Sequence, residues 1–420
     1  MTDDRLFPYQ ESGAAWLADR NRAILGDVPG VGKTRTVLRA LEMRAHPRTL
    51  VLCPAVAVDI WREEAAVMGY PAGRLLIVSY NRAVARPSMV TDVASFPFDA
   101  LVLDEGHYLK HLSAKRTRLA FGLAQRTPIV WLVTGTPMPR HPGELYPVFR
   151  YFWPDVLADK GIESYLDWLN TYTTWFAGEY GPRVTGVKNG PGLVRLLETR
   201  MLRRSEADVL PDLPPIMWSV YPLTHDEETE RAVNDVVSGL SSAERTELLT
   251  PNAAPSANTA AARHAIGRLK APHAAALIRD ELLNGNPDAS RIVFAYHRDV
   301  LDILEDLLRS VDTVVRVDGA TSLDARRAAR EAFQRRDARI YLGQIEAAGI
   351  AQTLTASPHV DIVEPDWRSD LNYQAGKRAH RIGQTAPVFV RFLALARTLD
   401  DVIVRQHHRE VKMVKEIVGL

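Results

Sequence analysis

Several features that define other classes of protein are missing from this 420-residue chain. Its single cysteine, Cys53, excludes a disulfide framework, and no Cys/His spacing typical of a zinc site occurs. No run of about 18 apolar residues is present, which excludes a membrane-spanning helix. Residues 1–5 (MTDDR) carry no basic stretch and precede no apolar one, so we expect no secretory signal and a cytoplasmic location.

The chain also has almost no net charge, because 52 basic residues face 51 acidic ones. A net charge of +1 argues against a protein that coats nucleic acid by bulk charge. The charges are unevenly distributed, however: residues 106–126 hold five basic and no acidic side chains, whereas residues 223–247 hold seven acids and two arginines. We therefore expect a local basic surface on an otherwise acidic body. Only 9 of the basic residues are lysine, which favours a GC-rich bacterial or phage source.

What the sequence does contain is an α/β pattern that occurs twice. The composition, 46% apolar and 25% charged, is that of a globular protein, and the length predicts two or three domains of about 150 residues. Short apolar runs without polar alternation predict parallel strands buried on both faces, with helices between them. The predicted strands are 23–25, 49–52, 75–78, 100–103 and 129–133 in the first lobe, and 291–295, 314–317, 340–342, 359–363 and 388–393 in the second.

The region between the two lobes has a different composition. Residues 150–205 are rich in aromatic side chains, and we expect a packed helical protrusion with a Gly-rich hairpin or loop near 178–192 rather than a base-stacking platform. Four prolines in 211–222 and the Ala- and Pro-rich stretch 250–262 predict loops or linkers. The expected domains are an N-terminal lobe over 1–222, with 150–205 as its protrusion, a helical or linker region over 223–270, and a C-terminal lobe over 271–420.

The segment GDVPGVGKT (26–34) has the context of a phosphate-binding loop, because it follows a short apolar strand and opens a helix. Gly30 and Gly32 would let backbone N–H groups converge on phosphate oxygens, next to the positive end of the helix dipole. Lys33 would bring a point charge to the β- and γ-phosphates, and the Thr34 hydroxyl would be a Mg²⁺ ligand. The alternative is a Gly-rich turn without a ligand.

A pair of carboxylates, Asp104 and Glu105, ends the predicted strand 100–103. Carboxylates at the carboxyl end of a parallel strand face the crevice where ligands bind. Asp104 would hold Mg²⁺, and Glu105 would polarise the attacking water as general base. Such a pair is often only a cap or a turn, but its place about 70 residues after the phosphate-binding loop, in the same run of strands, predicts a nucleotide hydrolase.

A basic cluster follows in the second lobe, in QAGKRAHRIGQ (374–384). On a helix, Arg378 and Arg381 would share a face. Two planar donors on one face suit the stabilisation of a triphosphate during cleavage, which is the role of an arginine finger. The alternative is a solvated basic helix face.

Taken together, these segments resemble the superfamily 2 helicase-like ATPases, and within them the SWI/SNF-type DNA translocases, over nearly the whole chain. The most specific matches are RMLRRSEADVLPDLPP (200–215) and the HRIGQ string, while GTPMPRHPGEL and FAYHRDVLD resemble the annealing-helicase subgroup. The other matching segments are LFPYQESGAAWL (6–17), GDVPGVGKT (26–34), LVLCPAVAVDIWREE (50–64), VSYN (78–81), LVLDEGHYLKHLSAKRTRLA (101–120), LVTGTPMPRHPGELYPVFRYFWP (132–154), RIVFAYHRDVLDIL (291–304), VDGATSLDARRAAREAFQ (317–334) and AAGIAQTLTASPHVDIVEPDW (347–367).

The resemblance implies an α/β fold of two tandem RecA-like lobes with an inter-lobe cleft that binds one ATP with Mg²⁺. Gln10 would contact the adenine, and the family also has Asp at the Asp27 position. The implied nucleotide contacts are Gln10, Asp27, Gly30, Gly32, Lys33, Thr34, Asp104, Gly349, Arg378 and Arg381. The metal would be held by Thr34 and Asp104, and the catalytic residues would be Lys33, Glu105, Arg378 and Arg381.

The resemblance also implies translocation on double-stranded or forked DNA by a monomeric motor without a membrane association. Contacts would go mainly to phosphates, so sequence preference should be weak. Trp367 could equally be a core residue, and His107 could either couple ATP to DNA or be a plain hydrogen-bonded loop histidine. The expected DNA-binding residues are Lys110, Lys115, Arg116, Arg140, Arg298, Ser322, Thr353 and Trp367.

Some positions depart from the family pattern. They include Gly106 and the Gly376-Lys377 pair, which stands where an acidic residue usually precedes the first finger arginine. None removes a residue expected to bind or cleave the nucleotide. Two other functions remain open from the sequence: a strand-separating or annealing helicase on forked DNA or RNA, and a nucleotide-gated DNA-binding scaffold that hydrolyses little ATP.

Overall fold

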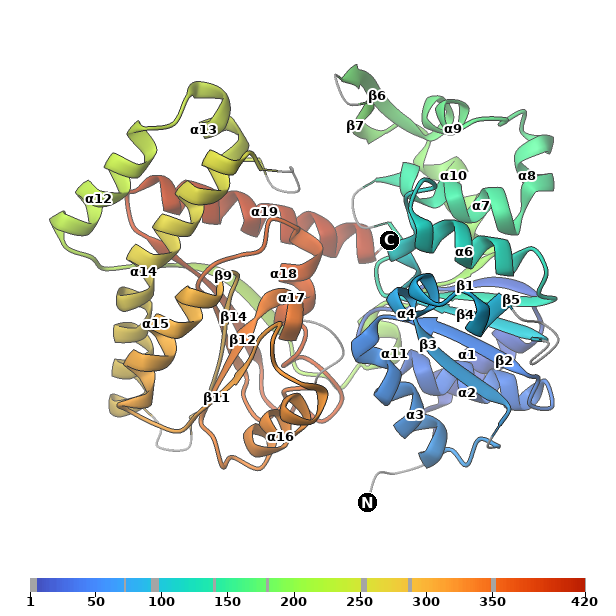
Figure 1. Ribbon diagram of the computed structural model, residues 1–420, viewed down its shortest axis with the longest axis horizontal. Coiled ribbons are helices and arrows are strands. Elements are labelled where there is room, and N and C mark those ends of the chain that lie inside the picture. The colour runs from blue at the N-terminus through green and yellow to red at the C-terminus, as the bar shows by residue number, and fades with distance from the viewer. Residues whose placement is uncertain are drawn as a thin grey trace. The chain divides into compact units, whose positions relative to one another are not determined.

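The protein forms two compact units, Met1–Pro211 and Asp212–Gly419, which are described separately (Figure 1). Among the described residues, no helix is both long enough and apolar enough to cross a membrane. This computed structural model describes residues 6–71, 73–91, 98–138, 141–178, 181–250, 255–285, 289–348 and 353–419.

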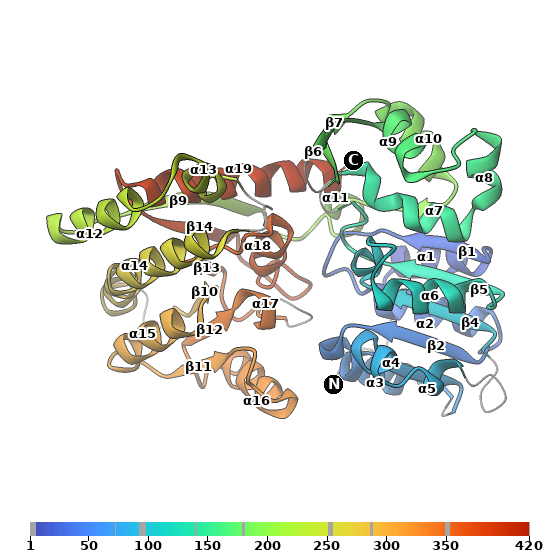
Figure 2. The same cartoon turned by 45° about the horizontal axis from the view of Figure 1, so that its top comes forward.

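The first unit is built on a parallel sheet of six strands in the order β3-β2-β4-β5-β1-β8 (Figure 2). Successive residues of β2 face opposite hydrophobic clusters, Leu50 and Leu52 on one side and Val51 and Cys53 on the other. Both faces are therefore buried, which explains the uninterrupted apolar runs. The strands are β1 (Arg22–Leu25), β2 (Thr49–Cys53), β3 (Leu75–Ser79), β4 (Ala100–Asp104), β5 (Ile129–Val133) and β8 (Met201–Leu202).

Helices cover this sheet on both faces. One cluster contains side chains of α1 (Pro8–Ala18), α2 (Lys33–Met43) and α3 (Val58–Val67), and the other contains side chains of α4 (Tyr80–Ala85) and α6 (Lys115–Ala124). Cys53 is fully buried in the first of these clusters, and burial raises the pKa of its thiol well above the ordinary value. The smaller elements of this part are the helices η1 (Ala55–Ala57), α5 (Ser88–Thr91) and η2 (Gly106–Leu109).

The aromatic-rich region of the first unit packs its side chains into a small core of its own. Tyr146, Phe149, Trp168 and Tyr172 are all buried there, with ring centroids 4.7–6.1 Å apart. An antiparallel hairpin of β6 and β7 extends from these helices and exposes Phe176. The elements are η3 (Pro142–Leu145), α7 (Tyr146–Phe152), α8 (Pro154–Asp159), α9 (Tyr165–Tyr172), β6 (Thr173–Gly178), β7 (Gly181–Val187), α10 (Gly190–Glu198) and α11 (Glu206–Val209).

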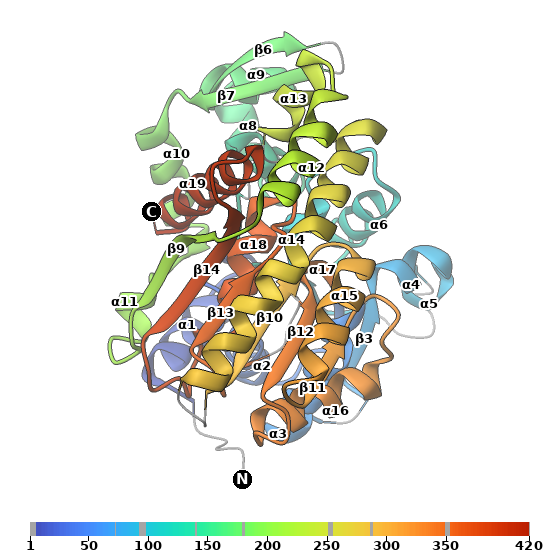
Figure 3. The same cartoon turned by 90° about the vertical axis from the view of Figure 1, so that its left-hand side faces the viewer.

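The second unit repeats the architecture with another six-stranded parallel sheet, in the order β11-β12-β10-β13-β14-β9. The long helix α14 and its neighbour α15 cross this sheet, as Figure 3 shows. The strands are β9 (Ile216–Leu223), β10 (Arg291–Ala295), β11 (Val314–Val317), β12 (Ile340–Gln344), β13 (His359–Ile362) and β14 (Val388–Leu395). The helices are α12 (Glu227–Ser238), α13 (Ser242–Leu248), α14 (Ala257–Asn284), α15 (Arg298–Arg309), α16 (Leu323–Gln334), α17 (Ile345–Ala348), α18 (Ser369–Gly376) and α19 (Leu399–Gly419).

Parts of two segments that the sequence predicts as loops or linkers are regular structure. The proline-rich segment contributes β9, which pairs with β14 at the edge of the second sheet and so belongs to the second unit. An edge strand tolerates Pro222, because one side of it needs no ladder donors. The stretch after residue 256 begins α14, whose N-cap Ser256 accepts a hydrogen bond from the Thr259 amide. Alanine is the best helix former, so the alanines that suggested a linker in the sequence begin a helix.

Buried polar groups connect α14 with α19. Lys270 donates to both carboxylate oxygens of Asp400, at 2.8 and 3.1 Å, and both side chains are almost fully buried. His407 lies about two turns further along α19. It is 1% exposed, and neither of its ring nitrogens has a hydrogen-bond partner among the described residues. Burial lowers the pKa of His407 well below its ordinary value of 6.5, and the charges of Arg263 and Lys270 lower it further.

We expect the stability of the second unit to decrease below pH 6.5 because of His407. In that range the unfolded chain binds a proton at this histidine and the folded chain does not, so acid favours unfolding. The urea-unfolding midpoint of the full chain should therefore fall between pH 7 and pH 5.5, and His407→Leu should make that fall smaller. The matched control is His111→Leu, which replaces an exposed histidine. A His407→Leu chain with the same pH dependence as His111→Leu would contradict this explanation.

Candidate nucleotide-binding site

The turn between β1 and α2 has the backbone of a phosphate-binding loop. Gly30 and Gly32 have φ angles of 90° and 73°, a region that side chains disfavour. A Cβ atom on Gly32 would also come within 2.4 Å of the Gln10 amide nitrogen. Glycine is therefore required twice over at this position, and α2 begins directly afterwards at Lys33 with its N-terminal amides facing the turn.

The Lys33 ammonium lies on the turn that it is expected to serve. Its Nζ donates to the carbonyl oxygens of Asp27 and Val28 at 3.0 and 3.1 Å. Thr34, in the first turn of α2, is partly exposed. A nucleotide phosphate would offer Lys33 a charged acceptor in place of two neutral carbonyls, and charge-assisted hydrogen bonds are the stronger ones.

Gln10 contacts the same turn from α1. Its Nε2 donates to the Val31 carbonyl at 3.1 Å, its Oε1 accepts from the Phe7 amide at 2.9 Å, and the side chain is 2% exposed. The Tyr9 hydroxyl donates to the same Val31 oxygen at 3.0 Å. The structure thus brings Gln10 to the phosphate-binding loop, while its contact with a base remains a prediction.

Asp27 forms an ion pair with Arg204, which is not among the site residues expected from the sequence. Arg204 donates to its Oδ1 through the backbone amide at 3.0 Å and through Nε at 3.2 Å, and its Nη2 contacts Oδ2. The same guanidinium contacts the Tyr9 carbonyl and lies 3.3 Å from the Ser12 hydroxyl. Asp27 is 1% exposed, so this pair anchors the base of the loop and neutralises a charge that would otherwise repel phosphate.

Arg204 could have been found from the sequence by its place in the family-specific segment RMLRRSEADVLPDLPP (200–215), although its partner is 177 positions away. The pairing follows from the sheet, because β8 lies beside β1 and brings the residues after Leu202 to the loop. Its neighbour Arg203 makes a second link, from Nη1 to the Gly26 carbonyl.

The acidic pair lies at the carboxyl end of β4, two strands from β1 in the same sheet. Asp104 accepts hydrogen bonds from the Trp61 indole at Oδ2, 2.8 Å, and from the Glu105 amide at Oδ1, 2.9 Å. The Tyr80 hydroxyl donates to its backbone carbonyl at 2.9 Å. Burial and then the Glu105 carboxylate raise the pKa of Asp104 to about 6, against the opposing effects of the Trp61 hydrogen bond and the Lys33 charge.

Glu105 is held in the left-handed region, with φ 47° and ψ 48°. Its Oε2 lies 3.2 Å from Nδ1 of the buried His107. The same ring nitrogen lies 3.0 Å from the Thr134 hydroxyl and 3.4 Å from that of Thr136, both just beyond β5. His107 therefore links the acidic pair to the next strand end by hydrogen bonds, which fits a hydrogen-bonded loop histidine as well as a residue that couples ATP to DNA.

The residues of the first unit fit a nucleotide phosphate with Mg²⁺. A Cβ atom on Gly32 would fill the space within the turn where a phosphate would bind. The Lys33 ammonium suits a phosphate, and the Thr34 hydroxyl and the Asp104 carboxylate suit Mg²⁺. No group of three or more His, Cys, Asp or Glu side chains could hold a metal ion in the part of the chain that is described. A Mg²⁺ that shares its coordination with phosphates and water requires no such group.

The basic cluster of the second unit differs from the sequence expectation. Helix α18 ends at Gly376, so Arg378 and Arg381 lie in the turns after it and do not share a helix face. Arg378 is 4% exposed, and Arg381 donates to the Thr353 hydroxyl at 3.1 Å. The expectation that the two arginines share a helix face is therefore wrong, and the burial of Arg378 also argues against the alternative of a solvated basic face.

Lys377, the residue that departs from the family pattern, is used within this turn. Its Nζ lies 2.9 Å from Nδ1 of His380, whose Nε2 lies 2.5 Å from the Pro214 carbonyl. Lys377 is 2% exposed and lies 5.8 Å from the centre of the Tyr373 ring. These contacts of Lys377 hold the turn that carries Arg378 and Arg381. Gly349, the remaining nucleotide candidate, lies outside the described residues.

The DNA-binding candidates of the first unit lie around α6. Lys110 forms an ion pair with Glu144 at 2.8 Å, Lys115 is exposed at the first position of α6, and Arg116 lies over the Tyr108 ring at 5.6 Å. Arg140 lies outside the described residues.

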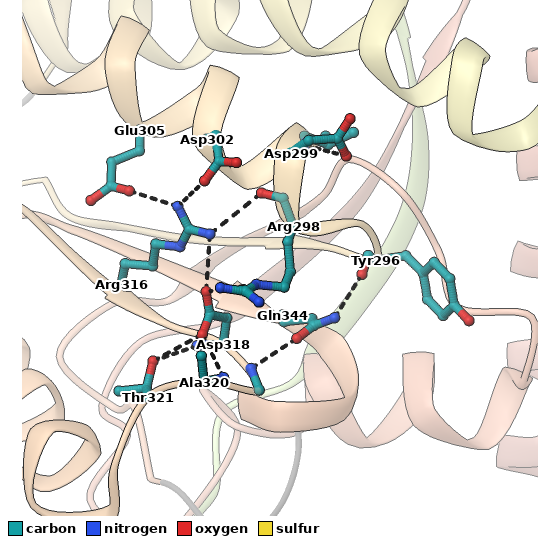
Figure 4. A network of polar contacts seen from close by, with 12 residues as sticks. Tyr296, Arg298, Asp299, Asp302, Glu305, Arg316, Asp318, Ala320, Thr321 and Gln344 are labelled. Carbon is teal, nitrogen blue, oxygen red and sulfur yellow. Dashed lines mark hydrogen bonds and ion pairs between the residues drawn. The ribbon is translucent and has the colours of Figure 1, made fainter.

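In the second unit, the candidate Arg298 lies in the polar network of Figure 4, at the carboxyl ends of β10, β11 and β12. Arg316 contacts Asp302, Glu305 and Asp318, and Asp318 also lies 3.4 Å from Nε of Arg298, whose side chain is 59% exposed. Gln344, at the end of β12, accepts from the Gly319 amide of this loop at 2.9 Å and donates to the carbonyl of Tyr296, just after β10, at 3.1 Å. The arrangement fixes the loop that leads to α16.

Ser322, the exposed N-cap of α16, accepts from the Ala325 amide at 3.3 Å. Thr353 holds Arg381, as described above. Trp367 is 6% exposed in the core of the second unit, with the Arg263 guanidinium 4.1 Å from its ring centre, so it has the placement of a core residue.

We expect Arg204→Ala to destabilise the first unit, because it leaves the Asp27 carboxylate buried without its cation. Breaking a buried pair costs about 3–5 kcal/mol of unfolding free energy, and the loosened loop should also bind nucleotide more weakly. Arg204→Lys should restore only part of this, since an ammonium cannot make the bidentate contact. Urea unfolding and nucleotide titration check both effects against Arg183→Ala, an exposed arginine of the hairpin. Equal stability of Arg204→Ala and Arg183→Ala would refute the anchoring role.

Comparison with known proteins agrees with this geometry. Residues 71–260 match the SNF2-related domain, and residues 274–383 match the helicase conserved C-terminal domain. The chain is 28% identical, over 95% of its length, to the SWI/SNF-related matrix-associated actin-dependent regulator of chromatin subfamily A-like protein 1 homolog of Caenorhabditis elegans. It is 26% identical, over 97% of its length, to the mouse DNA annealing helicase and endonuclease ZRANB3.

Those alignments cover 60% and 40% of the two relatives, so the chain spans about half of their length. Among solved structures, the Sulfolobus solfataricus SWI2/SNF2 ATPase core in complex with dsDNA matches with a TM-score of 0.42 and 19% identity, covering 99% of this chain and 93% of that one. Two consecutive family domains and homologues over nearly its whole length support the assignment of this chain to the SWI/SNF-type ATPases of helicase superfamily 2.

Proposed function

We propose that this chain hydrolyses ATP in response to DNA and uses the reaction to move along duplex DNA. The observation that carries the proposal is the meeting of two features at the carboxyl edge of one parallel sheet. The phosphate-binding loop follows β1 and the acidic pair ends β4, in a chain of the SWI/SNF-type family. Family membership supports DNA as the activating ligand.

In this proposal the first unit holds the nucleotide. The amides of the turn and the Lys33 ammonium bind the β- and γ-phosphates, while Gln10, already in contact with the turn, reads the base. Thr34 and Asp104 would hold Mg²⁺, which when bound neutralises charge on the phosphate oxygens. Arg204 fixes the position of the loop through its ion pair with Asp27.

Glu105 would orient a water for attack on the γ-phosphorus and accept its proton as the bond to the bridging oxygen breaks. Its left-handed backbone directs the carboxylate away from the strand axis, and His107 lies beside it at 3.2 Å. We assign Arg378 and Arg381 to the charge that develops on the phosphoryl oxygens during transfer. The support for that assignment is their residue type and their place in the helicase conserved C-terminal domain.

DNA would be bound mainly through phosphates, by exposed basic and hydroxyl side chains on each unit. Lys115 and the N-terminus of α6 are exposed on the first unit, and Arg298 and Ser322 are exposed on the second. Contacts of this kind give weak sequence preference and strong salt dependence. Trp367 drops out of the set because it is a core residue.

A second candidate is the annealing or separation of strands at forked DNA. The alignment with a protein named a DNA annealing helicase, over 97% of this chain, favours it. The two activities can coexist with the same ATPase cycle, and they differ in what happens to base pairs ahead of the motor.

Lys33→Ala and Glu105→Gln should separate nucleotide binding from hydrolysis. We expect Lys33→Ala to weaken ATP binding and abolish DNA-stimulated phosphate release. Glu105→Gln should retain binding and lower the turnover rate by at least about 100-fold, because the general base is lost. Steady-state phosphate release with and without duplex DNA, together with nucleotide titration, gives both values. A wild-type chain whose rate duplex DNA does not raise, and which Lys33→Ala leaves unchanged, would refute the proposed function.

A triplex-displacement assay and a forked-duplex unwinding assay distinguish the two candidates. A translocase that follows the duplex should displace the third strand in an ATP-dependent manner and leave a simple fork paired. Efficient fork unwinding would favour strand separation, and closure of a protein-coated bubble would favour annealing. The Glu105→Gln chain is the control for ATP dependence in each assay.

A further inference from the structure

Two buried aromatic side chains converge on the acidic pair from different parts of the first unit. Trp61 comes from α3, which follows β2, and Tyr80 is the first residue of α4, which follows β3. They donate to the two acceptor groups of one residue, Asp104: the indole to the carboxylate at 2.8 Å and the hydroxyl to the backbone carbonyl at 2.9 Å. Trp61 is 1% exposed and Tyr80 is 5% exposed, so water does not compete for either bond.

We propose that Trp61 and Tyr80 are positioning residues for ATP hydrolysis, Trp61 for the metal-binding carboxylate of Asp104 and Tyr80 for the peptide that aims Glu105. The proposal rests on the proposed function and adds to it a division of labour between two donors that do not themselves touch the nucleotide.

The role of Trp61 follows from how the Asp104 carboxylate is held. One oxygen accepts from the Trp61 indole and the other accepts from the Glu105 amide, so the plane of the carboxylate is fixed on both sides. An indole N–H can only donate, so the lone pair that it occupies is fixed as well. The remaining lone pairs are left to point at a cation or its water. Hydrogen bonds of this kind to a ligating carboxylate typically change metal affinity by about 10- to 100-fold.

The role of Tyr80 follows from the backbone at Glu105. The carbonyl that Tyr80 holds belongs to the peptide bond immediately before Glu105, and Glu105 adopts a left-handed conformation that residues with side chains rarely take. Fixing that peptide plane supports the left-handed conformation. The conformation in turn sends the Glu105 side chain towards His107 instead of along the strand direction. Loss of the hydroxyl should therefore misplace the base and leave the nucleotide-binding loop unchanged.

Both donors are part of the hydrophobic core, so a packing role must be separated from a positioning role. The chain offers a matched control for each. Trp131 belongs to the same cluster as Trp61, is fully buried, and donates its indole to the Arg20 carbonyl at 2.9 Å. Tyr146 is 1% exposed in the core of the aromatic-rich region, with its hydroxyl 3.5 Å from the Glu163 carbonyl.

The experiment compares Trp61→Phe with Trp131→Phe, and Tyr80→Phe with Tyr146→Phe, in the full chain. The first readout is the affinity for a fluorescent ATP analogue measured with Mg²⁺ and again with EDTA. The second is the turnover number and KM for ATP on duplex DNA, with the Mg²⁺ concentration that gives half-maximal rate. Urea unfolding of all four variants records the packing loss in each pair.

Trp61→Phe should lose about 10- to 100-fold of the Mg²⁺-dependent part of nucleotide affinity, keep its affinity in EDTA, and need correspondingly more Mg²⁺ for half-maximal rate. Trp131→Phe should show neither change. Tyr80→Phe should lower the turnover number by about 10- to 100-fold with an unchanged nucleotide affinity, since a misplaced base costs rate and not binding. Tyr146→Phe should turn over like the wild type.

Equal Mg²⁺ dependence of Trp61→Phe and Trp131→Phe would overturn the role of Trp61, and equal turnover of the two tyrosine variants would overturn that of Tyr80. If Trp61→Phe does not fold, it is replaced by Trp61→His, which retains a ring N–H donor. A folded Trp61→His chain that loses the Mg²⁺-dependent part of its nucleotide affinity would also overturn the proposal. A wild-type chain without Mg²⁺-dependent nucleotide binding would instead refute the proposed function itself.

Discussion

The parallel pairing of the strands is the constraint on which the rest of this molecule depends. Parallel strands place all their carboxyl ends at one edge of a sheet, so segments that are far apart in the sequence meet there. In the first unit this edge collects the phosphate-binding loop after β1, Trp61 and Tyr80 after β2 and β3, and the acidic pair at β4. In the second unit it collects Arg298, Asp318 and Gln344 after β10, β11 and β12 (Figure 4). Each polar network is a consequence of strand order.

The strands, the phosphate-binding loop and the acidic pair could be predicted from the sequence, because their signals are local. An apolar run without alternation reflects burial on both faces, and the glycines at 30 and 32 are needed for backbone conformations that other residues disfavour. Two predictions were wrong because they, too, relied on local signals alone. The alanines after Ser256 resemble a linker in composition, although a cap and high helix propensity make them the start of α14. The charge spacing around Arg378 resembles that of a helix, but α18 ends before this residue, at Gly376.

What could not be predicted are the partners of charged residues across long separations. Asp27 looks like a phosphate-site residue in the sequence, and only the position of β8 beside β1 shows that Arg204 neutralises it. Trp61 looks like the apolar face of an amphipathic helix, and its indole gains a polar partner only when β2 and β4 are paired. Buried polar atoms need partners, but the sequence does not say which ones. A few opposite charges, such as Lys270 with Asp400 and Arg204 with Asp27, are paired inside the fold.

The single cysteine has a practical consequence for testing the proposed motor activity. Cys53 is fully buried in the interior strand β2, and the raised pKa of its thiol keeps it protonated and unreactive towards alkylating reagents at neutral pH. The natural chain is therefore already a background for site-specific labelling, with no cysteine to remove. Cysteines introduced at one exposed position in each unit, such as Arg183 and Arg309, would accept a donor and an acceptor dye. Energy transfer between the dyes could then follow the two units through the nucleotide cycle in single molecules.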